Sequence, residues 1–275
     1  MLVSLTAIVV RLGAFLAGGT GWYPETGGMA LYDASVTVPE AWSVVSQGDL
    51  RSTEAVAGGR RFRYASDTPA DGLAMSAGPY VVTSRDSGGV RISTYLFEEH
   101  AELADAFLDA AAPEIERLAG RLGGYPGTKF DIVENFFTTG YGFPTYTLLG
   151  QEVIGMGARA LRPGYLDHEI AHVWFGNHVS VDLASGNWCE GLTTYVTNYL
   201  NTAAQGEAQA LEARQRVSQR YSVDVPAAKD FAPRAFREKT DDAGASVGYG
   251  KVSMVFHVLE RELGEDVLWA ALKDF

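Results

Sequence analysis

The stretch that decides the fold is LDHEIAHVWF, Leu166–Phe175. It holds two of the five histidines of the chain, His168 and His172, and Glu169 directly follows the first. Because an α-helix has about 3.6 residues per turn, side chains four positions apart lie on one face. Both imidazoles can therefore reach one metal ion, with Glu169 beside it as a base for water. The plainer alternative is a solvated helix face that happens to carry His and Glu.

A catalytic zinc site usually takes a third protein ligand and leaves one position for water. Glu190 is the candidate, because it lies in the first turn of the next expected helix, 18 positions after His172. The alternative is a capping box, since Asn187 is followed three positions later by Glu190. A carboxylate that binds zinc cannot also reach back to the cap amide, so the two interpretations exclude each other.

Three segments carry a resemblance to a known family. They are HEIAHVWFGN (168–177), CEGLTTY (189–195) and GYGKVSMVFHVL (248–259). Together they resemble the aminopeptidase N family of gluzincin zinc peptidases. The resemblance extends over nearly the whole chain, because GWYP (21–24) and the β-rich first third are similar to the amino-terminal β domain of that family.

The resemblance implies a thermolysin-like catalytic domain that hydrolyses peptides at their amino termini. It implies one Zn²⁺ per chain, with His168, His172 and Glu190 as ligands and Glu169 as the general base. It also places Tyr249 where the family keeps a tyrosine that stabilises the transition state. The alternative for Tyr249 is a packing residue at the start of a helix.

The sequence departs from the family pattern at two places. The gap between His172 and Glu190 holds 17 residues, one fewer than usual, and a loop can absorb that deletion. The family segment GAMEN, whose glutamate holds the free amine of the substrate, is replaced by GYGFP, so that Gly140, Tyr141 and Gly142 are the expected substrate contacts. A second alignment would use Glu134 instead, but KFDIVEN reads as the strand before this segment, which favours a structural role for Glu134.

Hydrophobic periodicity predicts an α+β chain. SVTVPEAWSVVS (35–46) and GLAMSAGPYVVTS (72–84) alternate as strands do, and turn residues separate them. We therefore expect a β-sandwich-like amino-terminal domain over residues 1–95, incomplete by comparison with the family. A thermolysin-like α+β domain is expected over residues 96–275.

Several elements of the second domain can be placed. Apolar residues recur at helical spacing over residues 98–124, where paired glycines end the run. Further strands are expected over 129–137 and 146–150. The helix with the histidines should start after Pro163 and end near Gly176, and two more helices are expected from Asn187 to residue 200 and over 251–263.

Composition limits the partners. The net charge of −12 and pI near 4.9 argue against nucleic acid and anionic membrane surfaces, which need clustered Lys and Arg. Cys189 is the only cysteine, and a buried inert thiol is expected. The apolar run MLVSLTAIVV (1–10) is shorter than the roughly 20 residues that span a bilayer. A buried strand explains this run better than the core of a signal peptide, which would need a preceding basic residue.

The sequence therefore predicts a zinc-dependent metallopeptidase of aminopeptidase type that acts on peptide substrates. Two alternatives stay open: an endopeptidase that lacks the amine anchor, and an incomplete, non-catalytic module of a longer protein. Cytoplasm and cell envelope are both open as compartments for a soluble chain, and the oligomeric state is not fixed by the sequence.

Overall fold

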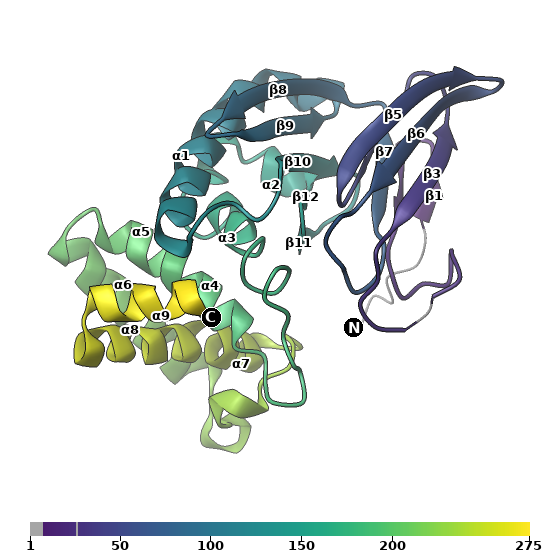
Figure 1. Ribbon diagram of the computed structural model, residues 1–275. Helices are drawn as coiled ribbons and strands as arrows, with labels where there is room; N and C mark the ends of the chain where they lie inside the picture. Colours follow the sequence, from purple (N-terminus) through teal and green to yellow (C-terminus); the bar gives the residue numbers. More distant parts are fainter. Residues whose placement is uncertain (1–7, 26) are drawn as a thin grey trace. The chain divides into compact units, whose positions relative to one another are not determined.

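The computed structural model describes residues 8–25 and 27–275 and divides into two compact units (Figure 1). The first, called the β unit, holds the described residues up to Pro113 together with Pro126–Ala160. The second, called the helical unit, holds Glu114–Tyr125 and Leu161–Phe275. Helix α1 (Ala104–Leu122) contributes to both units.

The β unit contains the strands. They are β1 (Ile8–Val10), β2 (Gly13–Leu16), β3 (Asp33–Val38), β4 (Ser43–Ser46), β5 (Asp49–Val56), β6 (Gly59–Ala65), β7 (Met75–Gly78), β8 (Val81–Ser87), β9 (Val90–Leu96), β10 (Lys129–Asn135), β11 (Gly140–Phe143) and β12 (Tyr146–Gly150). Short helical segments of the same unit are η1 (Glu98–Leu103), α2 (Gln151–Ile154) and η2 (Gly157–Arg159).

The helical unit contains the remaining helices. They are α3 (Leu166–Ala171), α4 (Cys189–Thr194), the π-helix η3 (Tyr195–Tyr199), α5 (Leu200–Ala203), α6 (Glu207–Asp224), η4 (Ala227–Lys229), η5 (Pro233–Ala235), α7 (Asp242–Ala245), the π-helix η6 (Ser246–Lys251), α8 (Val252–Leu263) and α9 (Glu265–Asp274). No helix in the described part of the chain is long and apolar enough to cross a membrane.

Three sheets build the β unit. Their strand orders are β1-β2-β7-β4, β3-β6-β5 and β11-β12-β10-β9-β8. Val44 and Ala77 of the first sheet share a buried cluster with Phe62 and Tyr64 of the second, so these two sheets pack face to face. This pairing has the sandwich-like arrangement expected for the amino-terminal region.

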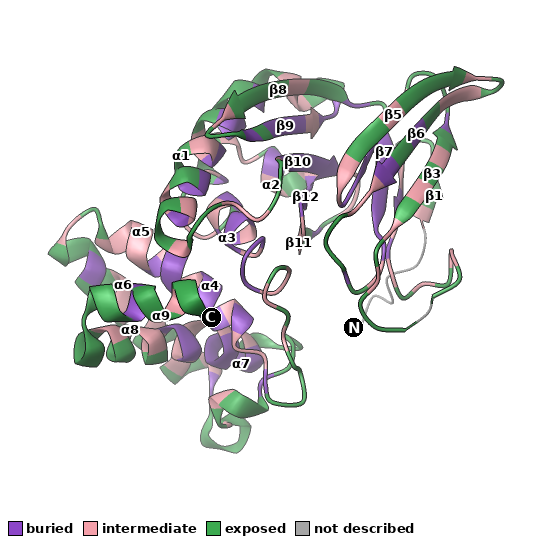
Figure 2. Cartoon of the chain, viewed as in Figure 1, coloured by how far each residue is buried: buried purple, intermediate pink, exposed green. Residues whose placement is uncertain are grey.

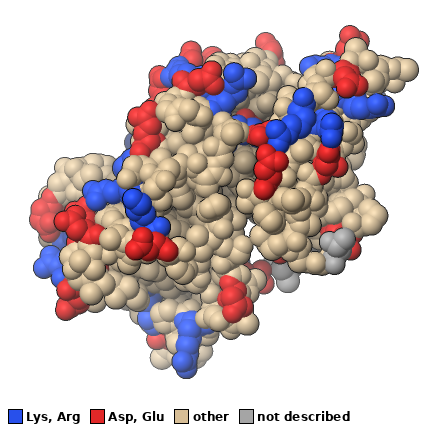
Figure 3. All heavy atoms as spheres, viewed as in Figure 1, with Lys and Arg blue, Asp and Glu red and all other residues tan. Residues whose placement is uncertain are grey.

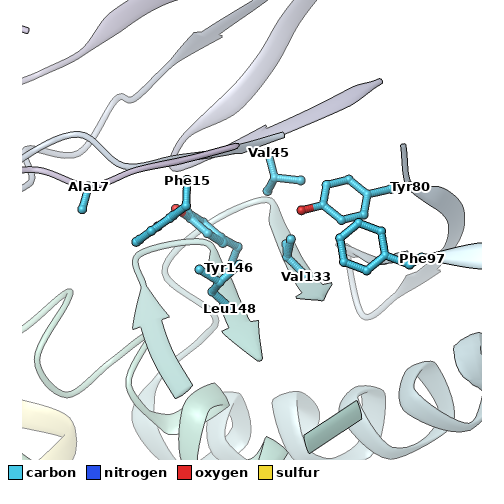
Figure 4. Packing of buried hydrophobic residues seen from close by; sticks show 8 residues of the cluster. All are labelled: Phe15, Ala17, Val45, Tyr80, Phe97, Val133, Tyr146 and Leu148. Atoms are coloured by element: carbon cyan, nitrogen blue, oxygen red, sulfur yellow. The ribbon is translucent and has the colours of Figure 1, made fainter. Parts of the chain in front are cut away.

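The first sheet also contributes to a second core. Phe15 of β2 and Val45 of β4 belong to a cluster with Val133 of β10 and with Tyr146 and Leu148 of β12 (Figure 4). Because the first sheet is covered on both faces, its strand β7 is buried along its whole length (Figure 2).

These elements confirm the α+β class, with sheets in the amino-terminal part and helices in the carboxyl-terminal part. The domain boundary near residue 95 remains a prediction. Strands β8 and β9, which largely precede it, pair in one sheet with β10, which follows it.

The expectation of a buried amino-terminal strand needs correction. Residues 1–7 lie outside the described residues, and the rest of the run forms β1. Val9 is 69% exposed and Val10 43% exposed, because β1 is the edge strand of its sheet and pairs only with β2. The strand is present, but its described part is not buried.

The helix expected over residues 98–124 is confirmed as η1 followed by α1. Phe107 and Leu118 on its apolar face are fully buried. Gly123 then adopts a φ of +91°, which ends the helix in the left-handed conformation that glycine favours.

Charged side chains of both signs are interspersed on the face drawn in Figure 3. Several form surface ion pairs, such as Arg63 with Asp33 at 2.6 Å and Arg121 with Glu265 at 2.7 Å. Exposed pairs of this kind contribute about 0 to 1 kcal/mol each, so they do not determine the fold.

Candidate metal centre

The first histidine of the motif, His168, lies inside the short helix α3, and the second, His172, is its C-cap. Leu166 and Ile170 are buried and fix the inner face of the helix. The helix ends at Ala171 with His172 as its C-cap, so it is shorter than the expected end near Gly176. After His172 the backbone tightens, since Val173 N–H donates to the Ile170 carbonyl at 3.1 Å.

Three side-chain donor atoms converge in the helical unit. Glu190 Oε2 lies 3.3 Å from His168 Nε2 and 3.4 Å from His172 Nε2. The two Nε2 atoms lie 3.2 Å apart. The structure thus brings together the three predicted ligands from α3 and α4 in a nearly equilateral triangle.

This triangle fits a zinc ion. Ligands about 2.0 to 2.2 Å from a tetrahedral zinc lie roughly 3.3 Å from one another, which is the spacing of these atoms. Two imidazole nitrogens and one carboxylate oxygen are donors that zinc accepts. Three protein donors also leave the fourth tetrahedral position for water or substrate.

Neighbouring groups orient one of the two imidazoles. His172 Nδ1 lies 3.0 Å from the Phe175 carbonyl oxygen, to which it can donate, and 3.4 Å from Cys189 Sγ. A proton on Nδ1 leaves Nε2 free to bind a metal. Among the described residues, by contrast, the buried Nδ1 of His168 has no hydrogen-bond partner.

The single cysteine, Cys189, is buried as expected, and its sulfur lies close to the predicted ligand His172. Cys189 Sγ donates to the Phe175 carbonyl at 3.0 Å. It therefore shares this carbonyl with His172, a role for which the sequence offered no signal beyond its position next to Glu190.

The Glu190 carboxylate faces the two histidines. Of the two residues in the expected capping box, only Asn187 accepts a hydrogen bond at the start of the helix. Asn187 Oδ1 accepts a hydrogen bond from Cys189 N–H at 3.1 Å at the start of α4. Burial opposes ionisation of Glu190, but its contacts with His168 and His172 outweigh burial and lower its pKa. For His172, burial opposes protonation, whereas Cys189 and Glu190 raise its pKa above the usual value.

Tyr249 lies in the π-helix η6 and reaches the same centre. Its ring stacks on the His168 ring with centroids 6.0 Å apart, and the Phe236 ring makes an edge contact with it, with centroids 6.1 Å apart. Burial, together with the charge of Glu190, raises the pKa of Tyr249, so its hydroxyl stays protonated and can donate at neutral pH. The charge of Glu169, which is half-buried, acts on this pKa in the same direction.

Two glycines allow the helices with Glu190 and Tyr249 to approach closely. A Cβ on Gly191 would lie 2.2 Å from Val252 Cγ1 and 2.9 Å from the Gly248 carbonyl oxygen. A Cβ on Gly248 would lie 2.3 Å from the Phe236 ring. Both glycines stand next to a predicted site residue in the sequence, which is the signal that could have identified them.

The expected substrate contacts lie in the β unit. Gly140, Tyr141 and Gly142 belong to β11, the first strand in the order of its sheet and hence an edge strand. The Tyr141 ring packs on Phe15 with centroids 6.4 Å apart. Their contact with substrate stays a prediction.

Glu134, the alternative amine anchor, is fully buried in β10. Its Oε2 accepts a hydrogen bond from Phe97 N–H at 2.8 Å, and its Oε1 lies 2.6 Å from His100 Nδ1. Burial raises the pKa of Glu134, although His100 and Phe97 favour its charged form. His100 is thus a partner of a buried carboxylate.

The part of the chain that holds this centre matches a known protein family. Residues 164–275 match the family model described as the Peptidase family M1 domain. This match confirms the family resemblance for that part of the chain. No curated protein shows significant similarity to the sequence.

Solved structures share the fold. The M1 zinc metallopeptidase from Deinococcus radiodurans is 18% identical, covers 98% of this chain and 63% of its own, and gives a TM-score of 0.72. A mutant of a two-domain M1 zinc metallopeptidase bound to L-arginine is 18% identical. The match covers 93% of this chain and 58% of the solved chain, with a TM-score of 0.64. The chain thus spans about three fifths of the solved chains that it matches, and at this identity the likeness shows the fold alone.

Proposed function

Residues 164–275 match the Peptidase family M1 domain, and from this premise we propose that the chain is a zinc-dependent metallopeptidase. The observation that carries the proposal is the triangle of His168, His172 and Glu190, whose donor atoms lie 3.2 to 3.4 Å apart. These residues would hold one Zn²⁺ per chain, as the D. radiodurans structure of the same fold is described as a zinc enzyme.

When bound, zinc would act as a Lewis acid that makes water acidic and polarises the scissile carbonyl. The protein supplies the proton transfers. Glu169 follows a ligand directly in α3, so its carboxylate is the base that accepts a proton from the attacking water. The same group then passes the proton to the leaving amine, which restores the carboxylate for the next turnover.

Tyr249 supplies the second polar contact of the transition state. Its hydroxyl is held protonated by burial and by the nearby carboxylates, so it donates a hydrogen bond to the oxyanion that develops on the carbonyl oxygen. Packing against His168 and Phe236 holds the ring in place, and the hydroxyl lies within hydrogen-bond reach of the Glu190 carboxylate.

We further propose peptide substrates and an aminopeptidase-type reaction with a weakened preference for a free amino terminus. The edge strand β11 is the place at which an extended peptide can add to the sheet. Gly140, Tyr141 and Gly142 bring no carboxylate to it, and a carboxylate binds an ammonium group best. The L-arginine in the second solved structure supports a site in this fold that accepts a free amino acid.

An endopeptidase is the second candidate, favoured by the same absence of a carboxylate from GYGFP. Glu134 offers little help as an anchor, because both of its oxygens are already engaged by Phe97 and His100.

The test is zinc stoichiometry combined with turnover of a peptide mixture and identification of the products. Zinc near one per chain with release of amino-terminal residues supports the aminopeptidase, whereas internal fragments support the endopeptidase. Zinc without turnover of any peptide contradicts both and favours a non-catalytic module.

A further inference from the structure

A carboxylate next to the first metal ligand holds the backbone on which that ligand is mounted. Asp167 Oδ1 accepts hydrogen bonds from the backbone N–H groups of Gly164 at 2.7 Å, Tyr165 at 3.2 Å and His168 at 2.9 Å. The N-cap residue of α3, Tyr165, provides no side-chain cap of its own. The donors that a helix leaves unpaired at its amino end are therefore satisfied in part by Asp167.

The other oxygen of Asp167 is bound by a second helix. Asn201 of α5 donates from Nδ2 to Asp167 Oδ2 at 2.9 Å, and the same nitrogen lies 3.3 Å from Glu114 Oε1. One amide group thus bridges two carboxylates with its two hydrogens. Because α5 continues the helical run of α4 and η3, this bridge connects the start of α3 to the run that carries Glu190.

The chain of contacts continues to a bidentate ion pair. Arg117 donates from Nε and from a terminal nitrogen to the two oxygens of Glu114 at 2.9 and 2.6 Å. Its terminal nitrogen also donates to the Val196 carbonyl at 2.8 Å, in the π-helix η3. Glu114 is only 9% exposed, so this pair forms a fixed support.

The two histidine ligands differ in how they are held. His172 is oriented through its Nδ1 by Phe175 and Cys189, whereas the described residues offer the Nδ1 of His168 no partner. Apart from its ring stacking on Tyr249 and its contact with Glu190, the position of His168 therefore depends on its backbone. Helix α3 has only six residues, too few to be stable without outside contacts.

We propose that Asp167 is a positioning residue of the metal centre. Together with Asn201 it fixes the first turn of α3 against the helical run of Glu190, which sets the distance between His168 and Glu190. The inference rests on the proposed zinc-dependent function only for its metal readout, because the network itself consists of contacts between residues of the chain.

The test compares Asn201→Leu and Asp167→Asn with wild type and with Asp182→Asn. Asn201→Leu keeps the size of the side chain but removes its N–H donor. Asp167→Asn replaces the accepting carboxylate with an amide, so that two amide groups face each other. Asp182 is the matched control, because this carboxylate of the same unit also accepts a backbone N–H, from Ala184 at 3.0 Å.

The zinc dissociation constant is measured by competition with a chromophoric chelator, and the visible spectrum of the cobalt-loaded protein reports the ligand geometry. We expect both test variants to bind zinc about 10- to 100-fold more weakly and to shift the cobalt bands, while the control matches wild type. If the variants melt earlier but keep the zinc constant and the cobalt spectrum of wild type, Asp167 is merely structural and the inference is wrong.

Amide exchange of metal-free protein separates this inference from the proposed function. In metal-free Asn201→Leu, amide exchange should be at least tenfold faster than in wild type, and the increase should be confined to residues 164–172. A wild type that binds no zinc refutes the proposed function, but unchanged exchange in this segment refutes the inference by itself. If Asp167→Asn does not fold, Asn201→Leu still decides the outcome.

Discussion

At the scale of single residues, the metal centre depends on three donor atoms that come from two helices. The pair His168 and His172 follows from the sequence, because four positions make one helical turn. For Glu190 the sequence left two roles open, a zinc ligand and a member of a capping box. Its carboxylate oxygen lies 3.3 and 3.4 Å from the two imidazole Nε2 atoms instead of at the cap. The residues around this triangle can therefore be tested one at a time.

Glu190→Ala should weaken zinc binding strongly, because two imidazoles alone do not complete the ligand set of a catalytic site. Asn187→Ala is its matched control, since Asn187 caps the same helix through Cys189 N–H. The control should lose about 1 kcal/mol of stability and keep its zinc affinity. Chelator competition and thermal melting of both variants check this, and equal zinc affinity in the two would return Glu190 to the capping role.

Tyr249→Phe should lower kcat by roughly 10² to 10³, as loss of one oxyanion donor usually does. The ring contacts with His168 and Phe236 remain, so fold and zinc content should be unchanged. Steady-state kinetics of the zinc-loaded variant provide the measurement. A kcat equal to that of wild type would identify Tyr249 as a packing residue.

The supporting residues could not be predicted in the same way. Asn201 and Glu114 lie 34 and 53 positions from Asp167, and no local spacing indicates that Asn201 bridges the two carboxylates. Their contacts depend on how α1 and α5 pack in the helical unit. The sequence thus identifies metal-binding groups that lie one helical turn apart. The residues that support them can be identified only from the tertiary packing.

At the scale of elements, two π-helical segments flank the centre. One, η3, follows α4, and the other, η6, contains Tyr249 and leads into α8. Such segments are frequent at functional sites because the extra residue redirects side chains. Close approach of α4 and η6 requires Gly191, whose Cβ would lie 2.9 Å from the Gly248 carbonyl oxygen, and Gly248 has no room for a Cβ beside Phe236.

Gly248→Ala should therefore destabilise the helical unit by about 1 to 3 kcal/mol and reduce kcat, because its Cβ would overlap the buried Phe236 ring. Gly250→Ala is the control in the same π-helix, since its Cβ would lie 3.4 Å from Val217, an ordinary contact. The control should be neutral or more stable by up to about 1 kcal/mol. Denaturant unfolding and kinetics of both variants check this, and equal losses in the two would contradict the close-packing explanation.

The elements that the sequence predicts are those with a regular apolar pattern. The helix over residues 98–124 and the strands that became β10 and β12 have this pattern and are present. Helix α6 was not predicted, because Ala210 is its only buried residue and no apolar period marks it. Strand β11 was not predicted either, because its two glycines weaken the strand pattern.

At the scale of the whole molecule, the proposed metal ligands, the proposed base Glu169 and Tyr249 all belong to the helical unit. The segment expected to contact the substrate belongs to the β unit. Metal binding and substrate recognition are therefore assigned to different units, and each can be tested separately.

Removal of zinc should lower the melting temperature of the helical unit. At free zinc about 1,000 times the dissociation constant, binding to the folded state contributes roughly 4 kcal/mol. For a chain of this size the loss corresponds to a shift on the order of 10 °C. Calorimetry with and without a chelator measures it, and re-addition of zinc should restore the transition; an unchanged melting curve would contradict a built metal site.

Substrate recognition is tested by one short peptide and its N-acetylated form. Because GYGFP supplies no carboxylate for an ammonium group, we expect a modest preference for the free amine. A preference above about 10³-fold, some 4 kcal/mol, would reveal a strong anchor and contradict the proposal. In that case Glu134→Ala is the variant to compare next.

The central claim is that His168, His172 and Glu190 hold the metal while Glu169 moves the proton. The most direct test is Glu169→Gln, because the amide preserves the shape of the side chain but cannot accept a proton from water. Zinc content and peptide turnover are measured on the same preparation, beside wild type. The account predicts about one zinc per chain in both proteins and hydrolysis in wild type alone. Substantial turnover by the zinc-loaded Glu169→Gln protein would contradict it.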